Sequence, residues 1–157
     1  HTGDLAQASL DASHGPFDLP PDDPGEFFPY SPVVGPRTPI APPVELRVDG
    51  DRLVGTMTLT APYVGPPNTV HGGVVALVFD ELLGAMHVVA GHGAMTGTLT
   101  LRSRRPTPIG APVELASWID RVEGRKVFTR GEFRHDGELT AEAEGIFIKV
   151  TMLEPPT

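Results

Sequence analysis

The stretch Gly65-Pro-Pro-Asn-Thr-Val-His-Gly-Gly73, followed directly by Val74-Val-Ala-Leu-Val-Phe-Asp-Glu-Leu-Leu83, decides the fold of this chain. Two adjacent glycines stand where an apolar segment begins. Residues 72–90 are the only long helical candidate in the sequence, with Gly91 and Gly93 as C-terminal stops. The segment is apolar on nearly every side, so other elements must wrap it. We therefore expect one central helix inside a shell of strands.

Alternating apolar and polar residues predict strands on both sides of this helix. Before it, residues 44–48 and 53–60 are joined by the turn residues 49–51 and should form a hairpin. After it, four further strands are predicted, at residues 95–101, 112–119, 127–133 and 139–150. The order is ββαββββ with short connections, including a turn at residues 121–125. This order predicts an α+β fold in which a curved antiparallel sheet wraps one long helix.

The first 42 residues differ in composition from the rest. Ten of the 18 prolines lie in residues 1–43, together with several acidic residues. Such a segment has little to bury and few backbone donors, so residues 1–42 should form an extended, Pro-rich arm. The aromatic residues Phe27, Phe28 and Tyr30 are expected to dock the arm on the folded body, which we place at residues 43–152.

Composition excludes several classes of protein. The formal net charge of -8 argues against a nucleic-acid binder. No run of about 18 apolar residues is present, so we expect no membrane span. The absence of cysteine excludes a disulfide scaffold and a thiol nucleophile. The first residues lack the pattern of a signal peptide, and a cytoplasmic location is expected.

One carboxylate, Asp80, interrupts the apolar helix, and we expect it to be buried there. Backbone N–H groups at a helix start can stabilise a developing oxyanion, and Gly72 is the first candidate because it has no Cβ. Asp80 would then act as a general base or as a nucleophile. The two residues are eight positions apart, a rise of about 12 Å. They cannot act on one carbon, so the site must combine two subunits.

Five segments of the sequence match the pattern of a known family: residues 63–73, 79–84, 101–108, 122–126 and 141–148. On these segments, the chain from Ile40 to Val150 resembles the hotdog-fold thioesterases, the family that includes the phenylacetyl-CoA and human acyl-CoA thioesterases. Two features differ from that family: position 68 is Asn, where close relatives often have Gly, and position 65 is Gly, where one subgroup has a catalytic-site Asn.

The resemblance implies an acyl-CoA substrate, no cofactor, and a homodimer or dimer of dimers with sites at the interface. It places Thr96, sixteen residues after Asp80, where a Thr or Ser orients the acid or the water. His71 would contact the substrate carbonyl or shape the turn before the helix. Gly73 and Asn68 are candidates for substrate binding. No His-Glu-x-x-His or other usual ligand spacing is present, so we predict no metal.

Eight of the 12 basic residues lie between positions 102 and 134. This local positive balance suits the phosphates of coenzyme A. Arg125 and Lys126 are the first candidates, followed by Arg104 and Arg105. Solvated strand ends that discourage edge pairing explain each of these residues equally well.

We predict that the protein hydrolyses acyl-CoA to free acid and CoA. Two alternatives remain open on the sequence alone: an enoyl-CoA hydratase or dehydratase of the same fold, and a noncatalytic acyl-CoA-binding protein. No Gly-x-Ser-x-Gly elbow is present, which argues against a serine hydrolase.

Overall fold

The computed structural model describes Val33, Pro42, residues 44–91 and residues 93–150. The predicted arm lies almost entirely outside these residues, as do its aromatic residues Phe27, Phe28 and Tyr30. The account below concerns the described part of the chain.

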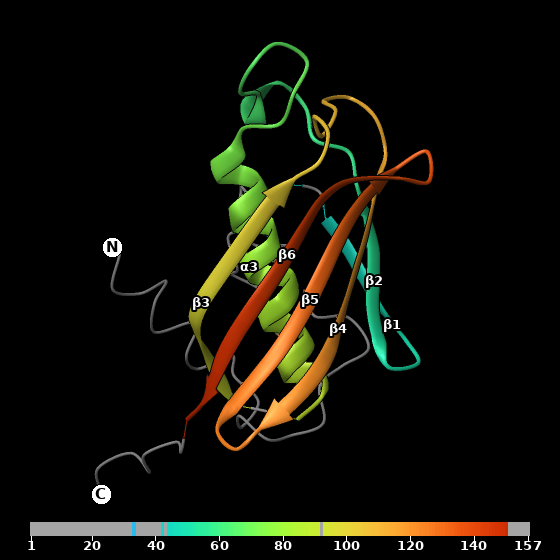
Figure 1. The fold of residues 1–157 in the computed structure, drawn as a ribbon. Helices are drawn as coiled ribbons and strands as arrows, with labels where there is room; N and C mark the ends of the chain where they lie inside the picture. The colour runs from blue at the N-terminus through green and yellow to red at the C-terminus, as the bar shows by residue number, and fades with distance from the viewer. Residues whose placement is uncertain (1–32, 34–41, 43, 92, 151–157) are drawn as a thin grey trace, which may run out of the picture.

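Six strands, one short 3₁₀ helix and one long helix make up the described part (Figure 1). The predicted order ββαββββ is confirmed. The elements are β1 (Val44–Asp49), β2 (Arg52–Met57), η1 (Ala61–Tyr63), α3 (Gly72–Val89), β3 (Ala94–Ser103), β4 (Val113–Glu123), β5 (Lys126–His135) and β6 (Glu138–Lys149).

Two predicted boundaries are wrong, and both follow from strand pairing. The strand predicted through residue 60 ends at Met57, because β1 begins opposite it at Val44 and β4 begins opposite it at Val113. The turn predicted from residue 121 is shorter, because β4 keeps pairing with β5 as far as Glu123. Gly124, at φ 59°, makes the turn itself.

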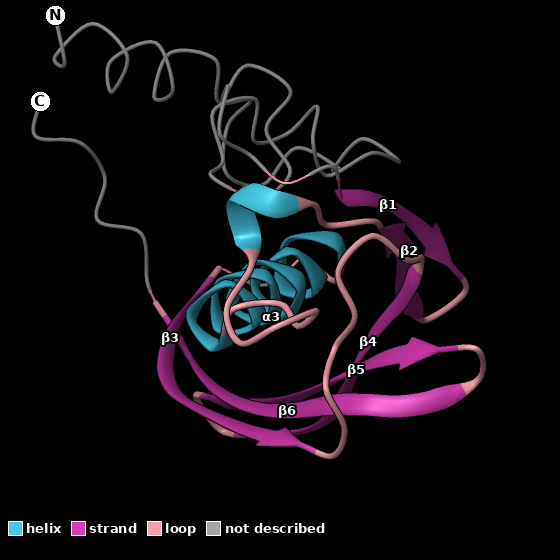
Figure 2. Ribbon diagram, turned by 90° about the horizontal axis from the view of Figure 1, so that it is seen from above, coloured by secondary structure: helices cyan, strands magenta, loops and turns pink. Residues whose placement is uncertain are grey.

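The strands form one antiparallel sheet in the order β1-β2-β4-β5-β6-β3. Seen from above, the sheet curves around α3, and β1 and β3 lie at its two edges (Figure 2). The curved sheet wrapped around one central helix is therefore confirmed.

Aromatic stacking and two glycines fix α3 against the sheet. The ring of Phe79 stacks on that of Phe133 with 3.8 Å between centroids and an interplanar angle of 7°. A Cβ on Gly131 would lie 3.0 Å from Leu83 Cδ2, and one on Gly145 would lie 3.1 Å from Leu83 Cδ1. Glycine at these positions lets the helix lie close to the strands.

The sheet covers only one side of α3. Gly72–Val89 has the length and composition of a membrane span, with a hydropathy of 1.6, but its apolar residues Phe79 and Leu83 pack in the core. On the other side Leu77 is 41% exposed and Asp80 is also exposed. The expectation that Asp80 is buried is therefore wrong for the single chain, because Asp80 lies beside the edge strand β3, where the sheet leaves α3 open to solvent.

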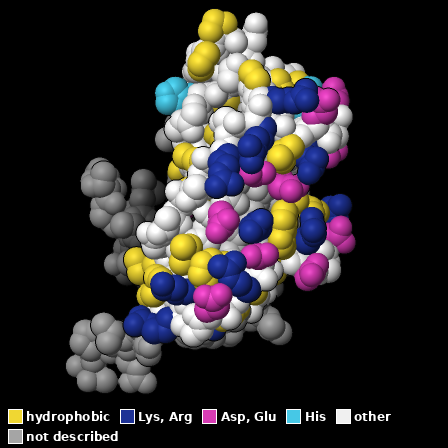
Figure 3. All heavy atoms as spheres, viewed as in Figure 1, with side chains coloured by type: hydrophobic (Ala, Val, Ile, Leu, Met, Phe, Trp, Pro, Cys, Tyr) yellow, Lys and Arg dark blue, Asp and Glu magenta, His cyan; other side chains and the backbone are white. Residues whose placement is uncertain are grey.

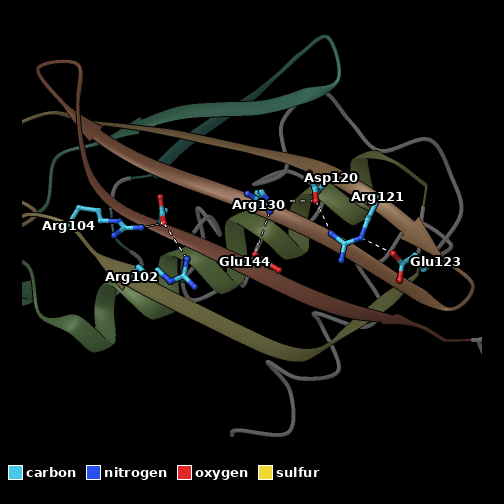
Figure 4. A network of polar contacts seen from close by, with 8 residues as sticks. Arg102, Arg104, Asp120, Arg121, Glu123, Arg130 and Glu144 are labelled. Atoms are coloured by element: carbon cyan, nitrogen blue, oxygen red, sulfur yellow. Dashed lines mark hydrogen bonds and ion pairs between the residues drawn. The ribbon is translucent and has the colours of Figure 1, made fainter.

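The outer face of the sheet carries mixed charges (Figure 3). Arg130 lies near both Asp120 (3.6 Å) and Glu144 (3.7 Å), and Arg121 hydrogen-bonds to Glu123 and Asp120 (Figure 4). These contacts, with the Glu123 bond the largest cause, raise the pKa of Arg121 above its ordinary value. Exposed pairs of this kind add little stability each, and they keep the surface hydrated.

Candidate functional site

The side chains of Asp80 and Thr96 meet between α3 and β3. Thr96 Oγ1 donates a 2.9 Å hydrogen bond to Asp80 Oδ1. Both residues are exposed. Thr96 occupies one carboxylate oxygen and leaves Oδ2 with no donor among the described residues. The carboxylate is thus held in one orientation with an oxygen directed at solvent.

The first backbone N–H groups of α3 differ in whether they have a hydrogen-bond acceptor. His71 is the N-cap, and its Nδ1 accepts a 2.9 Å hydrogen bond from Gly73 N–H. The N–H groups of Val74 and Val75 donate to His71 O at 2.9 and 3.1 Å. Gly72 N–H has no acceptor in the described part of the chain. Of the two glycines, Gly72 therefore offers the free donor, and Gly73 does not.

The hydrogen bond from Gly73 N–H also determines which ring nitrogen of neutral His71 carries the proton. Nδ1 can accept from Gly73 N–H only when it carries no proton, so the neutral ring has its proton on Nε2. His71 is exposed, so Nε2–H is a further donor that a ligand can reach, in addition to Gly72 N–H. A negatively charged or polarised oxygen at this helix start would also be favoured by the helix dipole.

The loop before α3 explains the two departures from the family pattern. A Cβ on Gly65 would lie 2.7 Å from the Cα of His71, so an Asn cannot replace it without a backbone shift. Asn68 has φ 60°, a left-handed conformation that Gly or Asn adopts most readily. The carbonyl of Asn68 accepts from Ile109 N–H at 3.2 Å. The structure thus gives Asn68 a role in shaping this loop.

The two halves of the predicted site lie apart on one helix. Gly72 begins α3, and Asp80 is eight residues further on, about 12 Å along the axis. The two described surface hollows lie on the outer face of the sheet and contain neither residue; their linings include Trp118 and Arg134. Within a single chain, the two predicted parts of the site are therefore separate.

The four predicted phosphate ligands do not come together. Arg104 and Arg105 bond through their backbone N–H groups to Thr140 O, whereas Arg125 O accepts from Lys149 N–H. Thr140 and Lys149 are nine residues apart on β6, a span of about 30 Å. The predicted residues thus form two groups at opposite ends of the sheet.

These two groups also differ in their ion pairs. Arg104 pairs with Glu142 at 2.6 Å, and Arg105 pairs with Glu138. The side chain of Arg104 is labelled in Figure 4. At the other end, Arg125 donates to Lys149 O at 3.3 Å. Among the described residues, no carboxylate pairs with Arg125, Lys126 or Lys149. Sequence reasoning missed Lys149, because only the β5–β6 pairing brings it beside the β4–β5 turn.

A second histidine, His87, has a structural role. His87 is buried, and its Nε2 lies 2.8 Å from Thr129 Oγ1. Its ring packs on Phe147 at 4.1 Å between centroids. No group of three or more His, Asp or Glu that could hold a metal ion occurs in the part of the chain that the structure describes.

Comparisons with known proteins agree with the fold. A model of the thioesterase superfamily matches residues 67–142. Acyl-coenzyme A thioesterase THEM4 from Xenopus laevis is 41% identical over 92 residues, and the Bos taurus protein is 38% identical over 92 residues. Each match covers 57% of this chain, and 41% and 38% of the respective relative, so the chain spans about two fifths of their length. A solved structure of a thioesterase superfamily protein is 37% identical with a TM-score of 0.76, and the match covers 94% of this chain and 75% of that one.

Proposed function

Because the chain belongs to the thioesterase superfamily, we propose that it hydrolyses acyl-CoA thioesters to the free acid and CoA. The observation that carries this proposal is the 2.9 Å hydrogen bond from Thr96 to Asp80, which leaves a carboxylate oxygen free for chemistry. The free Gly72 N–H at the helix start supplies the complementary donor. The relatives THEM4 from Xenopus laevis and Bos taurus, which are longer, are named acyl-coenzyme A thioesterases.

The active site would be shared by two copies of the chain. The start of α3 from one copy would face Asp80 and Thr96 of the other, because about 12 Å separates the two halves within one helix. The exposed side of α3 and the edge strand β3 offer apolar residues for this contact: Leu77 is 41% exposed and Leu101 is 36% exposed. β3 is also an edge strand, which has no second neighbour among the described strands. We therefore propose a homodimer as the active form.

In this site, Gly72 N–H and His71 Nε2–H would bind the thioester carbonyl oxygen and stabilise its negative charge as the tetrahedral intermediate forms. Asp80 Oδ2 would take a proton from water, whose oxygen attacks the carbonyl carbon. The C–S bond then breaks, and the CoA sulfur receives the proton. Direct attack by Asp80, with a transient anhydride that water hydrolyses, is the other route that this geometry permits.

The nucleotide end of CoA would bind Arg125, Lys126 and Lys149. Their side chains lie at the end of the sheet where β3 begins, since Ala94 pairs with Lys149. Thr96 is two residues from Ala94 on the same strand. This cluster has no carboxylate partner among the described residues, so it remains available for phosphate. Arg104 and Arg105 are already ion-paired and are the weaker candidates.

The test is release of free thiol from short, medium, long and aromatic acyl-CoAs by the wild type and by Asp80→Asn. Asn keeps the size of Asp and can still accept from Thr96, but it cannot act as a base. We expect kcat to fall about 100- to 10,000-fold in Asp80→Asn. Calorimetry with a nonhydrolysable acyl-CoA thioether should show binding to both proteins.

Equal turnover by the two proteins would refute the assignment of Asp80. Tight binding of the thioether without turnover of any acyl-CoA by the wild type would instead show a noncatalytic acyl-CoA-binding protein.

A further inference from the structure

The strand that carries Thr96 is interrupted by one extra residue, Gly97. Thr96 lies opposite Phe147 of β6 and Thr98 lies opposite Ile146, so Gly97 has no partner of its own and forms a β-bulge. We propose that Gly97 is a positioning residue, whose bulge places the hydroxyl of Thr96 beside Asp80. This inference rests on the proposed function, because it concerns the same carboxylate.

The bulge decides on which face of the sheet Thr96 lies. Phe147 faces α3, since its ring packs on His87, and Ile146 beside it in β6 must face outward. Thr96 therefore faces the helix, whereas Thr98, two residues later, faces outward. In a regular strand, residues two apart share a face.

A ladder without the bulge would break the contact with Asp80. If the pairing of Thr98 with Ile146 continued regularly, Gly97 would pair with Phe147. Thr96 would then shift onto the outer face of the sheet, because a slip of one residue exchanges the two faces. From there its hydroxyl could not donate the 2.9 Å hydrogen bond to Asp80.

Glycine is the residue that the bulge accommodates best. A Cβ at position 97 would lie 3.1 Å from the carbonyl oxygen of Ile146 and 3.2 Å from Ile148 Cγ1. The first of these atoms belongs to the backbone and cannot rotate away. Valine adds two further carbons at this place and favours a regular strand. We therefore expect Gly97→Val to shift the start of β3 toward the regular register.

The alternative explanation is that the bulge at Gly97 only bends the sheet. β4 has a comparable irregularity between Ile119 and Arg121, where the sheet curves around α3. If Gly97 acted only through this curvature, its replacement would affect an enzyme without the Thr96 hydroxyl just as strongly. A double-mutant cycle separates the two roles.

The cycle measures kcat for acyl-CoA hydrolysis by the wild type, Thr96→Val, Gly97→Val and Thr96→Val/Gly97→Val. We expect each single variant to lose about 10- to 100-fold, and the double variant to be no slower than Thr96→Val. Deletion of Gly97 is the matched control, since it removes the bulge but can keep Thr96 opposite Phe147. It should retain more activity than Gly97→Val.

Thermal unfolding and the molar mass in solution would show that each variant folds and assembles as the wild type does. Gly97→Ala, the smaller change, replaces Gly97→Val if that variant does not fold. The double variant could instead have a kcat below that of Thr96→Val by the same factor by which Gly97→Val falls below the wild type. This result would overturn the positioning role while leaving the proposed function intact. If Asp80→Asn and Thr96→Val both kept full turnover, the assignment of the active site to these two residues would fail, and this inference with it. If the wild type hydrolysed no acyl-CoA, the proposed function itself would fail.

Discussion

At the scale of single residues, the start of α3 leaves one backbone N–H without an acceptor among the described residues. His71 engages the N–H of Gly73 through its ring, and its carbonyl engages those of Val74 and Val75. Only Gly72 among these first residues keeps a free N–H within the described part of the chain. A Cβ there would meet no described atom within 4 Å, so the glycine is not required by packing inside the chain. In the proposed site, the missing Cβ instead lets the substrate carbonyl approach the N–H from outside.

Replacing Gly72 by proline removes this donor without disturbing the helix. His71 has φ -57° and ψ 132°, the extended conformation that a following proline requires, and Gly72 is the first helical residue, where proline is favoured. We expect Gly72→Pro to keep its helical circular dichroism and lose about 100- to 1,000-fold in kcat. Gly72→Ala keeps the N–H and should lose much less. Equal kcat values for the two variants would exclude Gly72 as the oxyanion donor.

The cations at the end of the sheet predict a selective effect on substrate binding. Arg125→Ala should raise KM for acyl-CoA about tenfold, because it removes one charged hydrogen bond to phosphate. KM for the matching acyl-pantetheine, which lacks the nucleotide, should stay near the wild-type value. Arg105→Ala, at the other end and paired with Glu138, is the control and should change neither. A parallel rise for both substrates in Arg125→Ala would remove the phosphate contact.

At the scale of elements, the approach of α3 to the sheet depends on glycine. A Cβ on Gly131 would lie 3.0 Å from Leu83 and 3.2 Å from the ring of Phe79. We expect Gly131→Ala to lower the free energy of unfolding by about 1–3 kcal/mol through overpacking, as measured by chemical denaturation. Gly84→Ala, inside α3 and without a described atom within 4 Å of its Cβ, should lower it much less or raise it. The reverse ranking would contradict this packing.

The elements themselves could be predicted from sequence, because apolar alternation and turn residues are local signals. The contact of Thr96 with Asp80 could be expected only by family resemblance. Alternation alone groups Thr96 with Thr98 on one face, and the bulge at Gly97 separates them. A bulge depends on pairing with a distant strand, here β6, and leaves no local pattern beyond the glycine itself.

At the scale of the whole molecule, the exposed side of α3 predicts assembly. We expect light scattering to give the mass of a dimer for the wild type and a lower mass for Leu77→Glu, with turnover lost in parallel. Val48→Glu is a matched control, because Val48 on β1 is 37% exposed and Leu77 is 41% exposed. It should remain dimeric and active. A fully active monomer of Leu77→Glu would contradict a shared site.

Sequence could predict the separation of Gly72 and Asp80, since eight residues of one helix span about 12 Å by helix geometry alone. It could not place the cations. Arg104 and Arg125 both belong to the same basic stretch of sequence. In the structure they contact residues at opposite ends of β6 and therefore lie at opposite ends of the sheet. Nor could the sequence show that Asp80 is exposed in a single chain. The apolar pattern of the helix predicts that it is covered, but it does not say whether the cover comes from the same chain.

The most direct measurement is thiol release from acyl-CoA by a heterodimer of Asp80→Asn and Gly72→Pro chains, co-expressed with two different affinity tags and purified on both. In a shared site, one of the two active sites of this heterodimer combines an intact Gly72 with an intact Asp80. We therefore predict about half the wild-type kcat per dimer, although each variant alone is nearly inactive. A heterodimer as inactive as its parents would contradict the shared site, because every site built within one chain carries one of the two defects.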